Sequence, residues 1–252
     1  MTPRRCRLFC FPHAGGNGSA FRAWAAHPAL AGVALQPVDY PGRQARFGEP
    51  ALARMEALVA LLLEELGPRF EPPFAFFGHS MGALVAFELA RTLRRRGLAA
   101  PRQLIVSGAS TPRLRRGGLP LHQLPDALLL ARLGLAGMHP APLLALMLPT
   151  LRADVELCET YRPADEPPLN VPLAAFAGSR DASVSWGELS AWRLQTRAAF
   201  VARQFPGDHH YLVPSQAGLC EALGRLLAGP PPQRTAMPSI HLETLDEHTA
   251  AR

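Results

Sequence analysis

Lysine is absent from this sequence, and all 26 basic residues are arginines. Together with 26 prolines and abundant alanine, this bias is typical of GC-rich codon usage, so a formal net charge of +6 is weak support for nucleic-acid binding. No nucleic-acid-binding motif accompanies the arginines. Two clusters stand out, at residues 94–96 and at Arg113, Arg115 and Arg116. We interpret both as solvated surface, with docking of an acidic partner as the alternative.

Cysteines and long apolar runs are also scarce. The four cysteines, Cys6, Cys10, Cys158 and Cys220, show neither C-x-x-C nor His/Cys metal-ligand spacing. We therefore expect reduced, mostly buried cysteines, no metal site and a cytoplasmic protein. No apolar run is long enough to span a bilayer, and the N-terminal one is too short for a signal peptide, so we expect neither membrane insertion nor export.

The 252 residues are 48% hydrophobic, which excludes a disordered chain and suffices for one large domain with its own core. From residue 229 the composition shifts to Pro, Thr, Ser, Glu and His. We expect a folded domain over residues 1–228 and a flexible tail over 229–252.

The stretch that organises this domain is FAFFGHSMGALVAFELAR, at residues 74–91. Large apolar residues predict a buried strand, and the spacing after Gly82 changes to that of a helix. Between them lies G-x-S-x-G, a motif that is informative only in this strand–turn–helix context. The motif predicts a strained turn that exposes the hydroxyl of Ser80. The alternative is an ordinary strand–turn–helix with an incidental serine.

Strands and helices alternate along most of the chain, which predicts an α/β fold with a mostly parallel sheet flanked by helices. Further strands are expected at 6–11, 33–38, 103–107, 171–177 and 200–205, and helices at 52–66, 185–197 and 214–228. Residues 113–168 break this alternation, with leucine-rich helical stretches at 119–135 and 143–161 that several prolines cut. We interpret about 113–168 as an inserted helical lid, with ordinary packing helices as the alternative.

A serine nucleophile needs a base to take its proton and an acid to orient that base. In the α/β-hydrolase fold these residues follow strand ends in the order Ser, Asp or Glu, His. Here Asp181 follows the strand at 171–177, and His209 follows the strand at 200–205. We therefore predict the catalytic triad Ser80, Asp181 and His209.

Other acids and one other histidine compete for these roles. Asp154 lies in a helical stretch of the insertion, Asp165 is followed closely by two prolines, and Asp208 adjoins His209 and would point elsewhere. His210 is the main rival base, and we expect it to pack or to face solvent.

The glycine-rich loop at 12–18 follows the first strand, where such loops supply backbone N–H groups to an oxyanion. We predict an oxyanion hole formed by the N–H groups of Met81 and Ala14. A phosphate cradle is the competing interpretation, but no G-K-[ST] follows the loop. His13 is expected to shape the turn rather than to act as a ligand or base.

Arg43 and Arg46 lie in a turn after the second strand. We expect them to hold backbone carbonyls or a carboxylate, and contact with an anionic part of the substrate is the alternative.

The chain resembles the discrete type II thioesterases that accompany polyketide synthases and nonribosomal peptide synthetases. The resemblance covers about residues 6–226. Its motifs are PHAGG at 12–16, YPGR at 40–43 with Arg46, FFGHSMGALVAFELAR at 76–91, SGAS at 107–110, LPTLRAD at 148–154 with Tyr161, PPL at 167–169, GSRD at 178–181 and PGDH at 206–209. Three positions depart from the family's usual pattern: Gln44 replaces a common acid, Ala182 a proline, and His210 an aromatic residue.

The resemblance implies hydrolysis of acyl thioesters on the phosphopantetheine arms of carrier domains, which removes stalled or aberrant acyl groups. It assigns the nucleophile, acid and base to Ser80, Asp181 and His209, and the oxyanion donors to Ala14 and Met81. It implies no cofactor, no metal and a monomer whose partners are carrier domains. Three alternatives stay open: a medium-chain fatty acyl-carrier hydrolase, an esterase of small free esters, and a non-catalytic binding protein.

Overall fold

The computed structural model describes residues 5–114, 119–136 and 140–228, and in this part of the chain six strands form one parallel sheet. The strand order is β2-β1-β3-β4-β5-β6. The strands are β1 (Cys6–Phe11), β2 (Val33–Pro37), β3 (Phe74–His79), β4 (Leu104–Ser107), β5 (Leu173–Gly178) and β6 (Phe200–Phe205). The α-helices are α1 (Met55–Leu66), α2 (Met81–Arg95), α3 (Asp126–Arg132), α4 (Ala141–Thr160), α5 (Trp186–Ser190) and α6 (Gln216–Ala228). Short 3-10 helices are η1 (Gly18–Ala26), η2 (Pro28–Leu30), η3 (Gln44–Arg46), η4 (Gly67–Arg69), η5 (Pro112–Leu114), η6 (Leu121–Gln123) and η7 (Ala191–Gln195).

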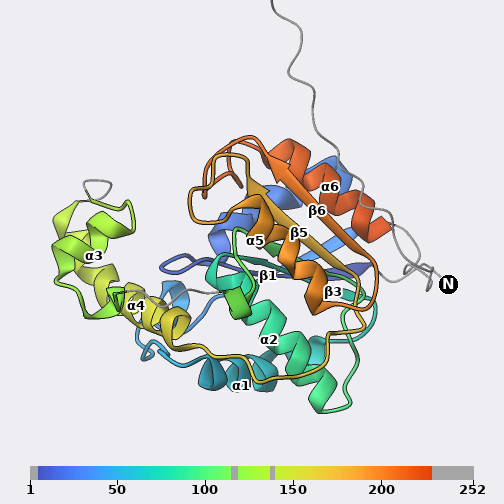
Figure 1. Cartoon of the computed structure of the whole chain (residues 1–252), viewed down its shortest axis with the longest axis horizontal. Helices are drawn as coiled ribbons and strands as arrows, with labels where there is room; N and C mark the ends of the chain where they lie inside the picture. Colours follow the sequence, from blue (N-terminus) through green and yellow to red (C-terminus); the bar gives the residue numbers. More distant parts are fainter. Residues whose placement is uncertain (1–4, 115–118, 137–139, 229–252) are drawn as a thin grey trace, which may run out of the picture.

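Two apolar clusters cover the two faces of the sheet. The first holds side chains of α1 and α2 together with Leu189 and Trp192. The second holds side chains of α6 with Phe21 and Trp24 of η1. Figure 1 shows α1 and α2 below the sheet and α6 above it. Because helices cover both faces, the four central strands are buried apolar runs, whereas the edge strands β2 and β6 are partly exposed. The bounds predicted for β1 and β6 are those observed.

Every strand ends at the same edge of the sheet, because all the pairings are parallel. The loops after β1, β3, β5 and β6 therefore meet at this edge, which we call the carboxyl edge. The glycine-rich loop, Ser80, Asp181 and His209 lie directly in these loops. The fold thus brings all the predicted site segments together, as expected for the carboxyl ends of an α/β sheet.

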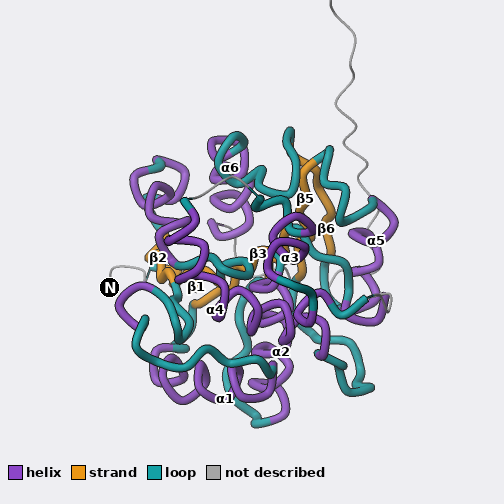
Figure 2. Tube along the Cα trace, turned by 90° about the vertical axis from the view of Figure 1, so that its left-hand side faces the viewer, coloured by secondary structure: helices purple, strands orange, loops and turns teal. Residues whose placement is uncertain are grey.

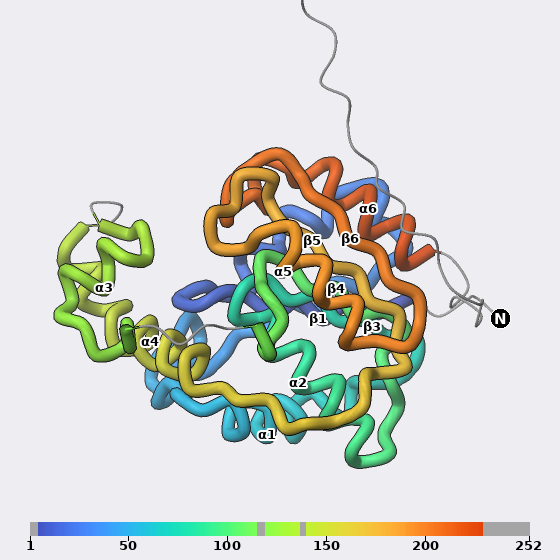
Figure 3. The backbone as a smooth tube through the Cα atoms, viewed as in Figure 1, coloured from blue at the N-terminus to red at the C-terminus, as the bar shows by residue number. Residues whose placement is uncertain are grey.

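The helical insertion leaves the sheet after β4 and returns before β5. In Figures 1 and 3, α3 and α4 stand to the left of the body, on the side where α2 begins, and Figure 2 looks onto them from that side. They share an apolar cluster of their own, built on Leu129, Leu130, Leu151 and Val155. The described part of 113–168 contains no strand, as the sequence predicted. Its role as a lid stays a prediction.

Two details of the predicted helices are wrong. Pro149 does not interrupt the second helical stretch but lies inside α4. A proline there removes one backbone hydrogen bond, and burial of Leu151, Val155 and Leu157 just beyond it offsets that loss. The helix expected at 185–197 ends at Ser190 and continues as η7, so only its capped first turns are α-helical.

Cys6, Cys10 and Cys220 are buried and Cys158 is half-buried, and no disulfide joins these four, all of which lie in the described residues. Within the same ranges no set of three or more His, Cys, Asp or Glu side chains is arranged to hold a metal ion. None of the described helices is long and apolar enough to cross a membrane. The tail predicted at 229–252 lies outside the described residues.

Candidate active site

Ser80 occupies a sharp turn between β3 and α2. Its φ of 54° and ψ of −115° lie in a region that non-glycine residues rarely adopt. The glycines on either side permit this turn. A Cβ on Gly78 would lie 2.0 Å from the carbonyl oxygen of Gly82, and a Cβ on Gly82 would lie 2.0 Å from that of Phe11. The strained turn predicted from G-x-S-x-G is therefore present, and it lies against the end of β1.

Asp181 and His209 form a direct hydrogen bond at the carboxyl edge. The distance from His209 Nδ1 to Asp181 Oδ2 is 2.8 Å, and the carboxylate is fully buried. Ser183 donates to the other carboxylate oxygen, Oδ1, through both its hydroxyl (2.6 Å) and its N–H (2.9 Å). Burial raises the pKa of Asp181, but the hydrogen bonds from His209 and Ser183 outweigh it and hold the pKa below its ordinary value. The carboxylate is thus kept ionised and oriented toward His209.

A buried chain of hydrogen bonds lies beneath the nucleophile. His79 Nδ1 is 2.8 Å from the Ser107 hydroxyl, which is 2.7 Å from the Tyr211 hydroxyl. The rings of His79 and His209 have centroids 5.1 Å apart, which brings His209 close to Ser80. Among the described residues no hydrogen bond joins the Ser80 hydroxyl to His209. Such catalytic bonds are often long until substrate binds.

His210 lies apart from the acid. Its ring is exposed and packs edge-on against His13, with centroids 5.6 Å apart, and against His209 at 5.4 Å. His13 covers Gly16 of its own loop, as expected of a histidine that shapes a turn. Burial and the charges of His210 and His209 lower the pKa of His13 to about 4, so His13 stays neutral near pH 7. The hydrogen bond of Asp181 goes to His209, and no bond to His210 is found among the described residues.

The competing acids are engaged elsewhere. Asp154 is buried and contacts Arg43, Asp165 pairs with Arg113, and Asp208 accepts the N–H of His210 within its own turn. None of these contacts reaches His209.

The predicted oxyanion donors have available N–H groups. In the loop after β1, the N–H of Gly16 bonds to the carbonyl of His13, and that of Gly15 bonds to Asp154. The N–H of Ala14 has no acceptor among the described residues. Met81 is the first residue of α2, where backbone N–H groups have no partner within the helix. Both N–H groups are therefore without a protein acceptor among the described residues, and the oxyanion hole stays a prediction.

The turn arginines hold groups of the protein itself, as we expected. The guanidinium of Arg43 pairs with Asp154 and donates to the carbonyl of Gly16. Arg46 pairs with Glu49 and Glu65.

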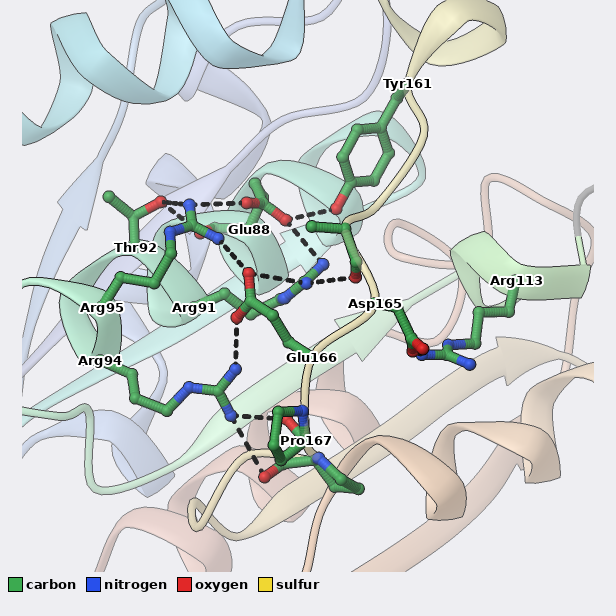
Figure 4. Close-up of polar contacts among 12 residues, drawn as sticks. Glu88, Arg91, Thr92, Arg94, Arg95, Arg113, Tyr161, Asp165, Glu166 and Pro167 are labelled. Atoms are coloured by element: carbon green, nitrogen blue, oxygen red, sulfur yellow. Dashed lines mark hydrogen bonds and ion pairs between the residues drawn. The ribbon is translucent and has the colours of Figure 1, made fainter.

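The cluster at 94–96 does not flank the site. Figure 4 shows Arg94 and Arg95 directed at Glu166, with Arg95 also bonded to Glu88. They lie at the end of α2, about 20 Å along the helix from Ser80. Arg94 and Arg95 fasten the segment after α4 to α2. Arg95 and Arg96 are still exposed, so this cluster is largely solvated surface, as interpreted, and it is poorly placed to dock a partner at the site. Arg115 and Arg116 lie outside the described residues.

Several contributors to the site escaped the sequence analysis. Ser183 could have been found, because an aspartate that bonds the N–H two residues later is a common turn signal. Ser107 and Tyr211 carry no such signal, since their contact joins residues 104 positions apart.

The chain matches known thioesterases over nearly its whole length. Residues 6–227 match the family model described as thioesterase domain. The gramicidin S biosynthesis protein GrsT of Aneurinibacillus migulanus is 37% identical over 229 residues, which is 88% of this chain and 89% of GrsT.

Two solved structures are similar as well. RedJ, a thioesterase from the prodiginine biosynthetic pathway in Streptomyces coelicolor, is 40% identical with a TM-score of 0.82, covering 88% of this chain and 91% of RedJ. BorB, the type II thioesterase of the borrelidin biosynthetic cluster, is 35% identical with a TM-score of 0.80, covering 90% of this chain and 92% of BorB. The strained serine at the carboxyl edge, the Asp181–His209 pair and these matches together identify the chain as a member of the thioesterase domain family, with the α/β-hydrolase fold.

Proposed function

We propose that this protein is a type II thioesterase that releases stalled or aberrant acyl groups from the phosphopantetheine arms of carrier domains. The observation that carries the proposal is the hydrogen bond between Asp181 and His209, at the same sheet edge as the strained Ser80. Relatives that share 35–40% of their residues with this chain are named as biosynthetic thioesterases. This similarity supports the same class of substrate here.

In the acylation step, His209 takes the proton of the Ser80 hydroxyl through Nε2 while its Nδ1–H donates to Asp181. The serine oxygen attacks the thioester carbonyl, and the resulting oxyanion accepts hydrogen bonds from the N–H groups of Met81 and Ala14. When the intermediate collapses, the carbon–sulfur bond breaks and His209 gives its proton to the departing pantetheine thiolate. The product is an acyl ester on Ser80.

In the deacylation step, water replaces the thiol. His209 takes a proton from this water, and the hydroxide attacks the acyl ester in the same oxyanion hole. Collapse returns the proton to Ser80 and releases a carboxylic acid. The proposed reaction uses side chains, backbone N–H groups and water, and takes place in the cytoplasm beside the synthase.

A comparison of substrates tests this function. We expect kcat/KM to be higher for an acyl-carrier thioester than for a p-nitrophenyl ester with the same acyl group. We also expect Ser80→Ala to abolish both activities. An enzyme that hydrolyses the ester well and the carrier thioester poorly would instead be an esterase. Failure of Ser80 to react with a fluorophosphonate would favour a non-catalytic protein.

A further inference from the structure

The loop that carries Ala14 is held in place by the inserted helix α4. The N–H of Gly15 donates to Asp154 Oδ2 at 2.7 Å, between residues 139 positions apart in the chain. One turn earlier on α4, Leu151 packs against the same glycine, because a Cβ on Gly15 would lie 3.1 Å from Leu151 Cδ1. Ala14 itself contacts both the main apolar cluster and the cluster of the insertion. The oxyanion loop is thus enclosed between the sheet edge and α4.

Arg43 fixes the carboxylate that makes this contact. Its two terminal nitrogens donate to both oxygens of Asp154, at 2.7 Å and 2.8 Å. The side chains of this pair are 7% and 2% exposed, so water does not compete for the contact. Arg43 also donates to the carbonyl of Gly16, in the same loop. A two-pronged ion pair of this kind sets direction as well as distance.

These contacts leave little freedom to the loop. The N–H of Gly15 is bound to α4, the carbonyl of Gly16 to Arg43, and the carbonyl of Pro12 accepts from the Tyr40 hydroxyl at 3.4 Å. Between these fixed points, the N–H of Ala14 keeps no acceptor among the described residues. An oxyanion donor works only if its position is set before the reaction, since reorganisation would raise the barrier.

We propose that Asp154 is a positioning residue for catalysis: held by Arg43, it sets the oxyanion loop so that the N–H of Ala14 faces the reacting carbonyl. This inference rests on the proposed function, because it assumes that Ser80 attacks a thioester. It gives the insertion a part in the chemistry, since the helix that packs against the oxyanion loop also positions it.

Asp154→Asn tests the proposal. Oδ2 accepts from both Gly15 and Arg43, and Oδ1 accepts from Arg43. An amide puts an NH2 group at one of these two positions, where it faces another donor, and it removes the charge that holds Arg43. Thr150→Val is the matched control. Thr150 lies one turn away on α4, and its hydroxyl anchors the helix to the body by donating to the carbonyl of Gly42 at 2.9 Å. It makes no contact with the oxyanion loop among the described hydrogen bonds. If Asp154 only anchored α4, as Thr150 does, both variants should change kcat to the same extent.

Two readouts separate positioning from stability. For an acyl-pantetheine thioester, we expect Asp154→Asn to lower kcat between about tenfold and a hundredfold and to leave KM within about twofold, because one donor is displaced. The affinity for a trifluoromethyl ketone analogue, whose adduct with Ser80 places an oxyanion in the hole, should fall in parallel. Thr150→Val should keep kcat within about twofold even if it lowers Tm.

Asp154→Glu supplies a second variant that keeps the negative charge for Arg43 but displaces the carboxylate, so it should lower kcat at least about tenfold. If Asp154→Asn does not fold, the kcat and ketone affinity of Asp154→Glu test the proposal instead. Variants of Asp154 that match Thr150→Val in kcat, or that lose kcat without losing affinity for the ketone, would overturn the proposal. A wild-type protein without thioesterase activity would instead contradict the proposed function.

Discussion

At the scale of single residues, the site depends on how Asp181 is held. Its carboxylate has one oxygen for His209 and one for Ser183, so its orientation is set on both sides. The sequence predicted Asp181 and His209 because each follows a strand end. It did not predict the pairing of Arg43 with Asp154, because these residues are 111 positions apart and neither one marks the other in the sequence.

Weakening the second support of Asp181 should affect catalysis more than stability. We predict that Ser183→Ala lowers kcat about tenfold, because Asp181 Oδ1 then keeps only the backbone N–H of residue 183 and the carboxylate holds His209 less firmly. The loss of stability should be about 1 kcal/mol, as for one hydrogen bond. Kinetics with an acyl-pantetheine thioester and thermal unfolding measure both effects.

Ser185→Ala is the control for this prediction. Ser185 caps α5 and forms a capping box with Glu188, and loss of such a cap also costs about 1 kcal/mol. It should leave kcat unchanged. Equal kcat in the two variants would show that Ser183 serves the fold only.

At the scale of elements, the insertion has two parts with different attachments. Residues 119–148 pack mainly within the insertion, on one another and on Leu151 and Val155 of α4. Beyond Pro149, α4 is fastened to the body by Thr150 and Asp154, and the segment after it is fastened to α2 through Tyr161, whose hydroxyl donates to Glu88. The sequence could not divide the insertion in this way, because the anchoring partners lie far away in the chain.

Hydrogen exchange should reveal this division. We predict faster backbone exchange over 119–136 and 140–148 than over 150–168, because the first part has few contacts with the body. An acyl ligand should slow exchange in the first part if it closes over the site. Uniformly slow exchange, unchanged by ligand, would contradict a lid.

The anchor at Glu166 should make stability depend on pH. Burial raises the pKa of this carboxyl, but hydrogen bonds from Arg95 and Arg94 and the charge of Arg91 outweigh it and lower the pKa to about 2. A carboxyl with a lowered pKa stabilises the fold above its ordinary pKa of 4.5, and this contribution is lost as the pH falls toward 2. We predict that Glu166→Gln lowers the free energy of unfolding at pH 7 by up to about 2 kcal/mol, allowing for solvent screening.

Denaturant titrations at several pH values measure this effect. The difference in free energy of unfolding between wild type and Glu166→Gln should shrink steadily as the pH falls from about 5.5. Glu221→Gln is the control, because the carboxylate of Glu221 is exposed and 3.9 Å from Arg225. A difference for Glu166→Gln that stays constant with pH would mean that the charge of Glu166 contributes nothing.

At the scale of the molecule, a parallel sheet brings the ends of distant strands to one edge. The strands and their succession along the chain could be predicted because apolar runs and turn residues recur along it, whereas their order in the sheet was not predicted. The 3-10 helices η1 and η2 were not predicted, since the residues between β1 and β2 lack a regular apolar period. The strand ends located the triad, whereas the contacts that hold the site depend on packing between remote segments.

Carrier docking belongs to this scale, and the arginines at 94–96 lie at the far end of α2 from Ser80. We therefore predict that reversing both Arg115 and Arg116 to Glu lowers kcat/KM for an acyl-carrier thioester and weakens its dependence on salt. Charge pairs between proteins mainly raise the association rate and are screened by ions. Reversing Arg22 and Arg225, on η1 and α6, is the matched control and should have little effect. Equal salt dependence for the carrier substrate and a short acyl-pantetheine would contradict docking through charge.

The central claim is that Ser80 and His209 carry the chemistry, and steady-state hydrolysis of an acyl-pantetheine thioester tests it most directly. We predict that Ser80→Ala and His209→Ala each lower kcat about 10⁴-fold, and that the double variant is no slower, because the residues act as a unit. His210→Ala should keep kcat within about tenfold. Activity that survives Ser80→Ala, or that disappears in His210→Ala and persists in His209→Ala, would contradict the account.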